Sequence, residues 1–163
     1  MQKTTIQLPE IKLVGIMART NNTLEIDPLT SKILSMVQKY FGEELSEKIV
    51  DRQKPGTTYC VYTDYASDVT GDYTYFIGEN VISFDDLPEG FTKLTIPAQN
   101  YVKFTNGPGS MPYVCKSVWQ RIWKMTSEEF GGERAYLADF EIYDERARDR
   151  NNIILDVYVG IKI

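Results

Sequence analysis

The strongest constraint on the fold of this chain is an internal repeat of its expected elements. A strand, a helix and two further strands are predicted from about residue 8 to 84, and again from about 91 to 163. The segments Tyr75–Gly78 and Val157–Gly160 occupy corresponding places in the two halves. A unit of about 75 to 80 residues buries too little apolar surface to fold alone, so the halves are expected to merge into one core with a pseudo-twofold relation.

The first half predicts one helix and three strands. Apolar residues recur at helical spacing after Asp27-Pro28, an N-cap followed by proline in the first helical position, and they stop near Gly42. Asn21–Thr23 is expected to be a turn or loop before this helix. Residues of high β propensity make up the three expected strands, which are residues 10–17, 58–65 and 72–84.

The second half predicts the same order of elements. Residues 91–105 form one or two strands interrupted by Pro97, and the glycine-rich loop that follows ends at Ser110, the expected N-cap of a helix over 111–125. Strands over 136–143 and 152–163 complete the chain. Together the halves predict an α+β fold with a curved antiparallel sheet, two main helices and a cleft between the repeats, where ligands commonly bind.

Length and composition exclude several classes of protein. A chain of 163 residues is enough for one domain, here residues 1–163, and 42% hydrophobic with 25% charged residues is typical of a soluble globular protein. No apolar run approaches the roughly 20 residues of a membrane span, and the start of the chain lacks a secretory signal, so a cytoplasmic protein without membrane contact is expected. The net charge of -5 disfavours direct binding to nucleic acid.

The residues that most often carry catalysis or bind metals are scarce. The chain has no histidine, which removes the usual general base, Ser-His and Cys-His nucleophile pairs and most zinc sites. Cys60 and Cys115 lie far apart in sequence and match no metal-binding spacing, so reduced thiols in apolar surroundings are expected. We therefore predict no catalytic residue, no metal and no cofactor.

The segment 136–143 contains the best candidate for a functional charge. Side chains alternate between the two faces of a strand, so Glu141 is expected to share a face with Asp139 and Tyr143 while Phe140 points to the other. A carboxylate in this apolar company lies either at a wet strand edge or in a pocket that takes a positive group. The residues alone leave both alternatives open.

The repeat and three segments resemble the GyrI-like family. The segments are Val118–Trp123 of the expected helix, Asp139–Tyr143 of the strand and the ending Asp156–Lys162. The family comprises small-molecule-binding domains related to gyrase-inhibitor proteins and to the effector domains of AraC-type and multidrug-responsive regulators. The resemblance covers nearly the whole chain and implies an effector-binding domain for sensing or sequestration, with hydrophobic, often aromatic cations as ligands.

Site residues follow from the same resemblance. Glu141 corresponds to the acidic floor of the pocket, and Tyr158 is expected beside it if residues 136–143 and 152–162 form a hairpin. Phe76, the repeat counterpart of Tyr158, and Tyr62 are further candidates for the aromatic walls. The remaining ligand-binding candidates are Tyr143 and Trp119; the alternative for Trp119 is a core anchor between helix and sheet.

A helix-turn-helix module like that of the regulators is not expected within this sequence, because the repeat uses residues from about 10 to 163. Single-domain members of the family occur in bacteria and include proteins carried on mobile gene cassettes, and such an origin is a hypothesis for this chain. Two other functions stay open: an interaction protein that inhibits or protects a partner such as DNA gyrase, and a small-molecule hydrolase with Glu141 as general base.

Asp139 and Asp156 are expected near the site or in ion pairs with Arg146, Arg148 and Arg150. Haem binding is disfavoured because no histidine can bind the iron.

Overall fold

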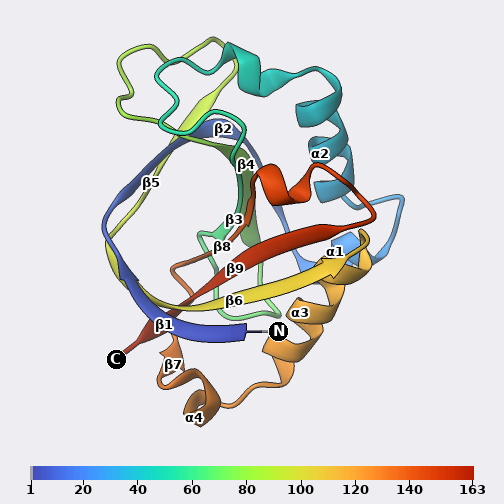
Figure 1. Ribbon diagram of the computed structural model, residues 1–163, viewed down its shortest axis with the longest axis vertical. Coiled ribbons are helices and arrows are strands. Elements are labelled where there is room, and N and C mark those ends of the chain that lie inside the picture. Colours follow the sequence, from blue (N-terminus) through green and yellow to red (C-terminus); the bar gives the residue numbers. More distant parts are fainter. Residues whose placement is uncertain (1) are drawn as a thin grey trace.

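A curved antiparallel sheet of nine strands forms the centre of the computed structural model, which describes residues 2–163 (Figure 1). Its strands follow one another in the order β1-β6-β9-β8-β3-β4-β2-β5, and the short β7 pairs with β9. The strands are β1 (Gln2–Leu8), β2 (Ile11–Thr20), β3 (Thr58–Thr63), β4 (Tyr73–Asn80), β5 (Thr92–Ile96), β6 (Gln99–Gly109), β7 (Glu133–Arg134), β8 (Ala138–Tyr143) and β9 (Ile153–Lys162).

Strand pairing follows the predicted duplication. β1 of the first half pairs with β6 of the second, and β5 of the second half pairs in the same way with β2 of the first. At the middle of the sheet β3 lies beside β8, and each is flanked by the last strand of its own half. The predicted fold class, α+β with duplicated units and a curved antiparallel sheet, is confirmed.

The repeat contains one strand more than expected. Each half begins with a strand that crosses to the other half, β1 or β5, so the order is strand-strand-helix-strand-strand, with the small β7 in addition. β1 was missed because residues 2–8 are mostly polar and mostly exposed along its length, which leaves little apolar alternation to read.

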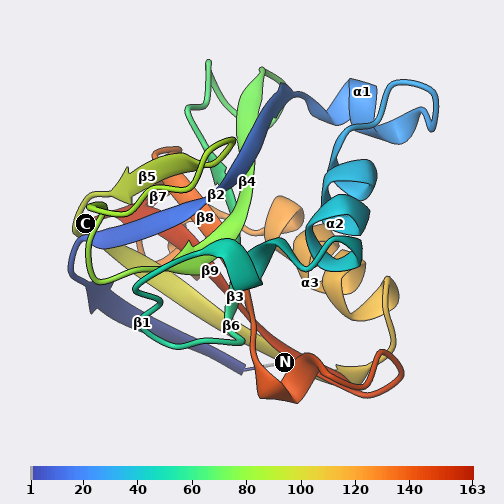
Figure 2. The same ribbon diagram turned by 90° about the horizontal axis from the view of Figure 1, so that it is seen from above.

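The helices lie on one side of the sheet, as Figure 2 shows for α1, α2 and α3. The two longest are α2 and α3, and the remaining helices are short. Their bounds are α1 (Asn22–Ile26), α2 (Ile33–Gly42), α3 (Tyr113–Lys124) and α4 (Ser127–Phe130), with single 3-10 turns η1 (Leu45–Lys48) and η2 (Glu145–Ala147). Within residues 2–163, no helix has both the length and the apolar character that crossing a membrane requires.

Three helix starts differ from the predictions. The expected turn at Asn21–Thr23 is instead the start of α1, because the Asn21 side chain accepts a hydrogen bond from the backbone N–H of Leu24 at 2.8 Å. The first main helix begins at Ile33 rather than at Pro28, since residues 27–31 form a turn. The second begins at Tyr113 after Pro112 rather than after Ser110. A side-chain cap sets the start of α1 only, since neither α2 nor α3 has a side-chain cap hydrogen bond at its start. Apolar spacing predicted the bodies of the two long helices.

The sheet has an apolar core on each face. The face away from α2 and α3 carries Phe76, Tyr101, Phe140 and Tyr158 in one buried cluster. The other face is covered by the helices, with α3 over one cluster and α2 over another. The sheet separates these apolar clusters, and side chains alternate between its two faces along each strand. Only every second residue of a strand therefore points to the face that the helices cover.

Candidate functional site

Glu141 lies near the middle of the sheet, on the face covered by the helices, and is only 3% exposed. Its carboxylate accepts three hydrogen bonds from neutral donors. The Tyr62 hydroxyl donates at 2.9 Å, the Trp119 indole Nε1–H at 2.6 Å and the Tyr143 hydroxyl at 2.7 Å. Two strands and a helix that are far apart in sequence therefore meet on one carboxylate.

Strand register explains this convergence. Glu141 is paired with Cys60 of β3, and Tyr62, two residues further along β3, points to the same face. Tyr143 follows Glu141 by two residues and shares its face as well. α3 then places Trp119 over this part of the sheet, where its ring meets the ring of Tyr62 edge-on, with centroids 5.3 Å apart.

Among residues 2–163, the charge of Glu141 has no cationic partner. None of the ion pairs formed by residues 2–163 includes this carboxylate. Burial raises the pKa of the Tyr62 and Tyr143 hydroxyls well above the usual value, and the negative charge of Glu141 raises it further. Both hydroxyls thus stay protonated and donate at neutral pH, but they contribute dipoles rather than a neutralising charge.

Glu141 opens onto a cavity of about 830 Å³ between α2 and the sheet, called the main cavity below. One wall comes from α2, through Ile33, Leu34 and Val37. The sheet side includes Cys60 and Tyr75 in addition to the residues that bond to Glu141. A volume of this size accommodates a drug-sized molecule.

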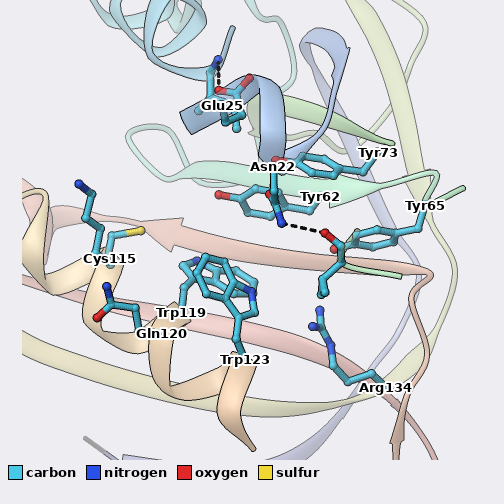
Figure 3. Close-up of a pocket in the computed structure, with 13 residues that line it drawn as sticks. Asn22, Glu25, Tyr62, Tyr65, Tyr73, Cys115, Trp119, Gln120, Trp123 and Arg134 are labelled. Atoms are coloured by element: carbon cyan, nitrogen blue, oxygen red, sulfur yellow. Dashed lines mark hydrogen bonds between the residues drawn. The ribbon is translucent and has the colours of Figure 1, made fainter. Parts of the chain in front are cut away.

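A second space of about 450 Å³ continues from the main cavity toward α3 and is called the aromatic chamber below (Figure 3). Both spaces are lined by Tyr62 and Cys115, which stand at their junction. The rings that line the chamber are Tyr62, Tyr65, Tyr73, Trp119 and Trp123. Most are close to one another, with Tyr62 5.7 Å from Tyr73 between ring centroids. Aromatic faces therefore make up much of the wall of the aromatic chamber.

The structure brings four of the six sequence-predicted site residues together and separates two. Glu141, Tyr62, Tyr143 and Trp119 form the hydrogen-bonded group described above. The expected position of Tyr158 beside Glu141 is wrong by one residue of register. Val157 lies opposite Glu141, and Tyr158 lies opposite Phe140, on which its ring stacks at 4.7 Å.

Phe76 also lies away from the cleft. It belongs to the buried cluster on the other face of the sheet, together with Tyr158, and its exposed fraction is 0%. The two residues do correspond in the repeat, as expected, but their shared parity points both into the core rather than into the main cavity. A shift of one residue in strand register moves a side chain to the opposite face of the sheet. Because Phe76 and Tyr158 correspond in the repeat, the wrong face was predicted for both.

The two aspartates expected near the site have separate ion pairs. Asp156 bonds to Arg146 at 2.6 Å, as predicted, but it lies on the Tyr158 side of the sheet. Asp139 is fully buried and pairs with Arg134 at 2.7 Å, a residue outside the predicted arginine cluster. The backbone N–H of Gly160 also donates to Asp139, at 2.8 Å. These contacts occupy both carboxylates, in contrast to Glu141.

Sequence reasoning missed several residues that line the cleft. Tyr73 and Tyr75 alternate along β4 on the face of Tyr62, so strand parity was the signal that could have found them once the pairing of β3 with β4 was known. Cys115 lies on α3 four residues before Trp119, a spacing that places both on one helix face. Cys115 could be identified as a lining residue only once the position of α3 on the sheet was known.

The cysteines do not form a disulfide, and both line the main cavity. Cys60 is buried and Cys115 is partly exposed. Burial, followed by the charge of Glu141, raises the pKa of both thiols, so neither is a ready nucleophile at neutral pH. In the part of the chain that the structure describes, no group of three or more histidine, cysteine, aspartate or glutamate residues is placed to bind a metal ion.

Comparison with known sequences connects this geometry to a family. The family described as "Integron-associated effector binding protein" matches residues 4–161. The chain is 25% identical over 151 residues to the protein YobU of Bacillus subtilis, covering 93% of this chain and 92% of that protein. It is 32% identical over 117 residues to the transcriptional regulator BrlR of Pseudomonas aeruginosa, covering 70% of this chain but 41% of BrlR.

Solved structures with the same architecture extend the comparison. The integron cassette protein VCH_CASS2 from the mobile metagenome of Vibrio cholerae is 26% identical, with a TM-score of 0.76, and the match covers 98% of this chain and 95% of that one. The structure of SAV2435 bound to tetraphenylphosphonium has a TM-score of 0.78 over 99% of this chain and 94% of the other, at 15% identity.

Proposed function

Because the chain belongs to the family of integron-associated effector binding proteins, we propose that its effector is a hydrophobic cation that places its positive charge against Glu141. The family assignment gives the class of function, which is binding of a small molecule. The cleft geometry narrows the ligand class. The single observation that carries the proposal is a buried carboxylate, 3% exposed and open to a large cavity, without a cationic partner among residues 2–163.

Burial of an unpaired charge is expensive. Three neutral donors offset part of the desolvation of Glu141, but a cation gives this buried carboxylate a full opposite charge. The surrounding apolar walls select against small, strongly hydrated ions, because these lose their water without gaining comparable contacts. A bulky organic cation with delocalised or shielded charge is weakly hydrated and fits both requirements.

The aromatic rings favour the same ligand class. Tyr62 and Trp119 sit at the carboxylate itself, and Tyr75 lies next to Tyr62 with ring centroids 5.3 Å apart. A cation over such a ring gains about 0.5 to 2 kcal/mol, more as the site becomes drier. The relative SAV2435, bound to tetraphenylphosphonium, shows that a protein of this fold can hold such a cation, and this supports the proposal.

The similarity to transcriptional regulators supports a role in transcription control. BrlR is a transcriptional regulator, and the part of it that this chain matches is 41% of its length. We propose that this chain also acts in the control of transcription, as the part that binds the effector and either senses or sequesters it. Any effect on DNA would then pass through another protein segment or a partner.

The test compares a cation with a neutral molecule of similar shape. Methyltriphenylphosphonium and triphenylphosphine oxide are titrated by calorimetry into the wild-type protein and into Glu141→Gln. The cation is expected to bind wild type with a Kd near the micromolar range, about -8 kcal/mol, and to lose at least about tenfold in Glu141→Gln. The neutral oxide is expected to bind both proteins equally weakly.

Glu79→Gln is the matched control. Glu79 is as buried as Glu141, at 1% exposure, but its carboxylate lies beside Arg52 rather than in the cleft. This variant removes an equal charge and should leave cation binding unchanged. Equal losses for the cation and the oxide in Glu141→Gln would mean that the carboxylate only supports packing, and the proposal would then be abandoned.

A further inference from the structure

The main cavity carries positive charge as well as the carboxylate of Glu141. Arg148 and Arg150, which follow the 3-10 turn η2, both line it. Their side chains are exposed, so they belong to its rim, whereas Glu141 is buried. Two more carboxylates line the cavity: Asp144 is paired with Arg146, and Glu25 accepts from the backbone N–H groups of Lys32 and Ile33. A ligand in this cavity thus meets exposed arginines at the rim and the buried carboxylate of Glu141 inside.

These two arginines have no ion pair to neutralise them. Their neighbour Arg146 is bound by Asp144 at 2.9 Å and by Asp156 at 2.6 Å, so these two carboxylates are already paired. The other acidic residues of the segment, Glu145 and Asp149, are exposed and form no ion pair with the arginines. No ion pair in residues 2–163 includes Arg148 or Arg150. The guanidinium groups of Arg148 and Arg150 are therefore not held by a carboxylate of the described residues and stay available to a ligand at the rim.

The segment that carries the arginines is held in place. Asp144 caps η2 by accepting from the backbone N–H of Arg146 at 3.0 Å. The carbonyl of Arg150 accepts from the backbone N–H of Met111, another residue of the main cavity, at 3.0 Å. The backbone positions of the rim arginines are therefore fixed relative to the cavity, even though their side chains reach into solvent.

A rim of this kind opposes a purely cationic ligand and suits an amphoteric one. Two arginines repel an approaching cation, but they attract an anionic group that projects from the mouth while the cationic part reaches Glu141. Resting on the function proposed above, we infer that the effector of this protein is amphoteric, with a flat or bulky hydrophobic cation and a carboxylate, sulfonate or phosphate at its outer end. Arg148 and Arg150 would bind that anionic group.

The experiment uses rhodamine B, which carries a xanthene cation and a free carboxylate, and its ethyl ester, which keeps the cation but lacks the negative charge. Affinities are measured by fluorescence anisotropy at pH 7.5 in low salt. The wild-type protein is expected to bind rhodamine B at least about fivefold more tightly than the ester. In Arg148→Gln/Arg150→Gln the acid should weaken about fivefold, while the ester should bind equally or more tightly. The preference of wild type should shrink as salt is added, because the rim is exposed.

The matched control is Arg121→Gln/Lys124→Gln, which removes two exposed cations of α3 that lie outside the main cavity. It should preserve the preference for the acid. An ester that binds wild type as tightly as the acid, or a loss of both dyes in the rim variant, overturns the inference. If the wild-type protein binds the ester as tightly as the acid, and the ester depends on Glu141, this inference fails while the proposed function stands. If neither dye nor methyltriphenylphosphonium binds, both fail together.

Discussion

The indole N–H of Trp119 donates to the carboxylate of Glu141 at 2.6 Å, across 22 residues of chain, and joins α3 to the centre of the sheet. The contact does two things. It satisfies part of a buried charge, and it places a large ring at the junction between the aromatic chamber and the carboxylate. A residue whose alternative assignment was a core anchor is therefore also a direct partner of the candidate site.

Replacing Trp119 with phenylalanine keeps an aromatic ring but removes this donor. Trp119→Phe is expected to lower the free energy of unfolding by about 1.5 to 3 kcal/mol, because a hydrogen bond to a buried charge is lost. Urea denaturation measures the change. Trp123→Phe serves as the control, since Trp123 is 54% exposed, and it should change stability by less than about 0.5 kcal/mol. Similar losses in the two variants would contradict the role of the indole N–H.

The buried pair of Asp139 and Arg134 predicts a second stability effect. Asp139 is fully buried, so within residues 2–163 Arg134→Met leaves its charge with the Tyr65 hydroxyl and the Gly160 N–H as its remaining donors. The expected cost is about 3 to 5 kcal/mol in the free energy of unfolding. The double variant Arg134→Met/Asp139→Asn removes both charges and should recover part of that loss. A double variant less stable than Arg134→Met would show that the charge on Asp139 is not what makes the single change costly.

Stability should fall at alkaline pH because of the hydroxyls around Glu141. The pKa values of Tyr62 and Tyr143 are raised well above normal in the folded protein, by burial first and by the charge of Glu141 second. In the unfolded chain these groups ionise near pH 10. Their contribution is therefore complete below about pH 10 and is lost as the pH rises toward the folded-state values.

Urea midpoints between about pH 9 and 11 should show this decline, and it should be shallower in Tyr62→Phe/Tyr143→Phe. Absorbance of tyrosinate gives an independent measurement. Ordinary reversible ionisation of all eleven tyrosines near pH 10 in the folded protein would refute the expectation.

Cys115 offers a chemical probe of the cleft. It lines both the main cavity and the aromatic chamber, and burial, with Glu141 as the next cause, holds its thiol pKa well above normal. In Cys60→Ser, Ellman's reagent should therefore modify Cys115 slowly, and saturation with methyltriphenylphosphonium should slow it at least about fivefold further. Cys115→Ala is the control, because buried Cys60 should react little with or without ligand. If the cation leaves the rate of Cys115 modification unchanged, the cation binds elsewhere.

The alternatives of a gyrase-directed interaction protein and of a hydrolase stay predictions, because no feature of the described residues tests either one. The hydrogen bonds of Glu141 account for its environment as a binding group. Hydrolysis assays with candidate substrates would decide whether Glu141 also activates water. If hydrolysis takes place at Glu141, methyltriphenylphosphonium should inhibit it by competing for the same cavity.

Much of the fold could be predicted because its signals are local. Apolar spacing located the bodies of α2 and α3, and β propensity located β3, β4, β8 and β9 to within a few residues. β1 could not be read in the same way, since its polar residues are stabilised by pairing with β6 and not by their own preference. The family resemblance indicated Glu141, while the local pattern alone left a wet strand edge equally open.

By itself, the sequence determined which side chains share a face of each strand, so Glu141, Asp139 and Tyr143 had to lie together and Phe140 had to point away. Only the tertiary structure decided which residues of other strands join them, because inter-strand register is set by the packing of whole faces and turns. Val157 rather than Tyr158 stands opposite Glu141, and this one-residue difference sends Tyr158 into the core. The same packing brings Tyr62 and Trp119, which are 79 and 22 residues from Glu141 along the chain, onto its carboxylate.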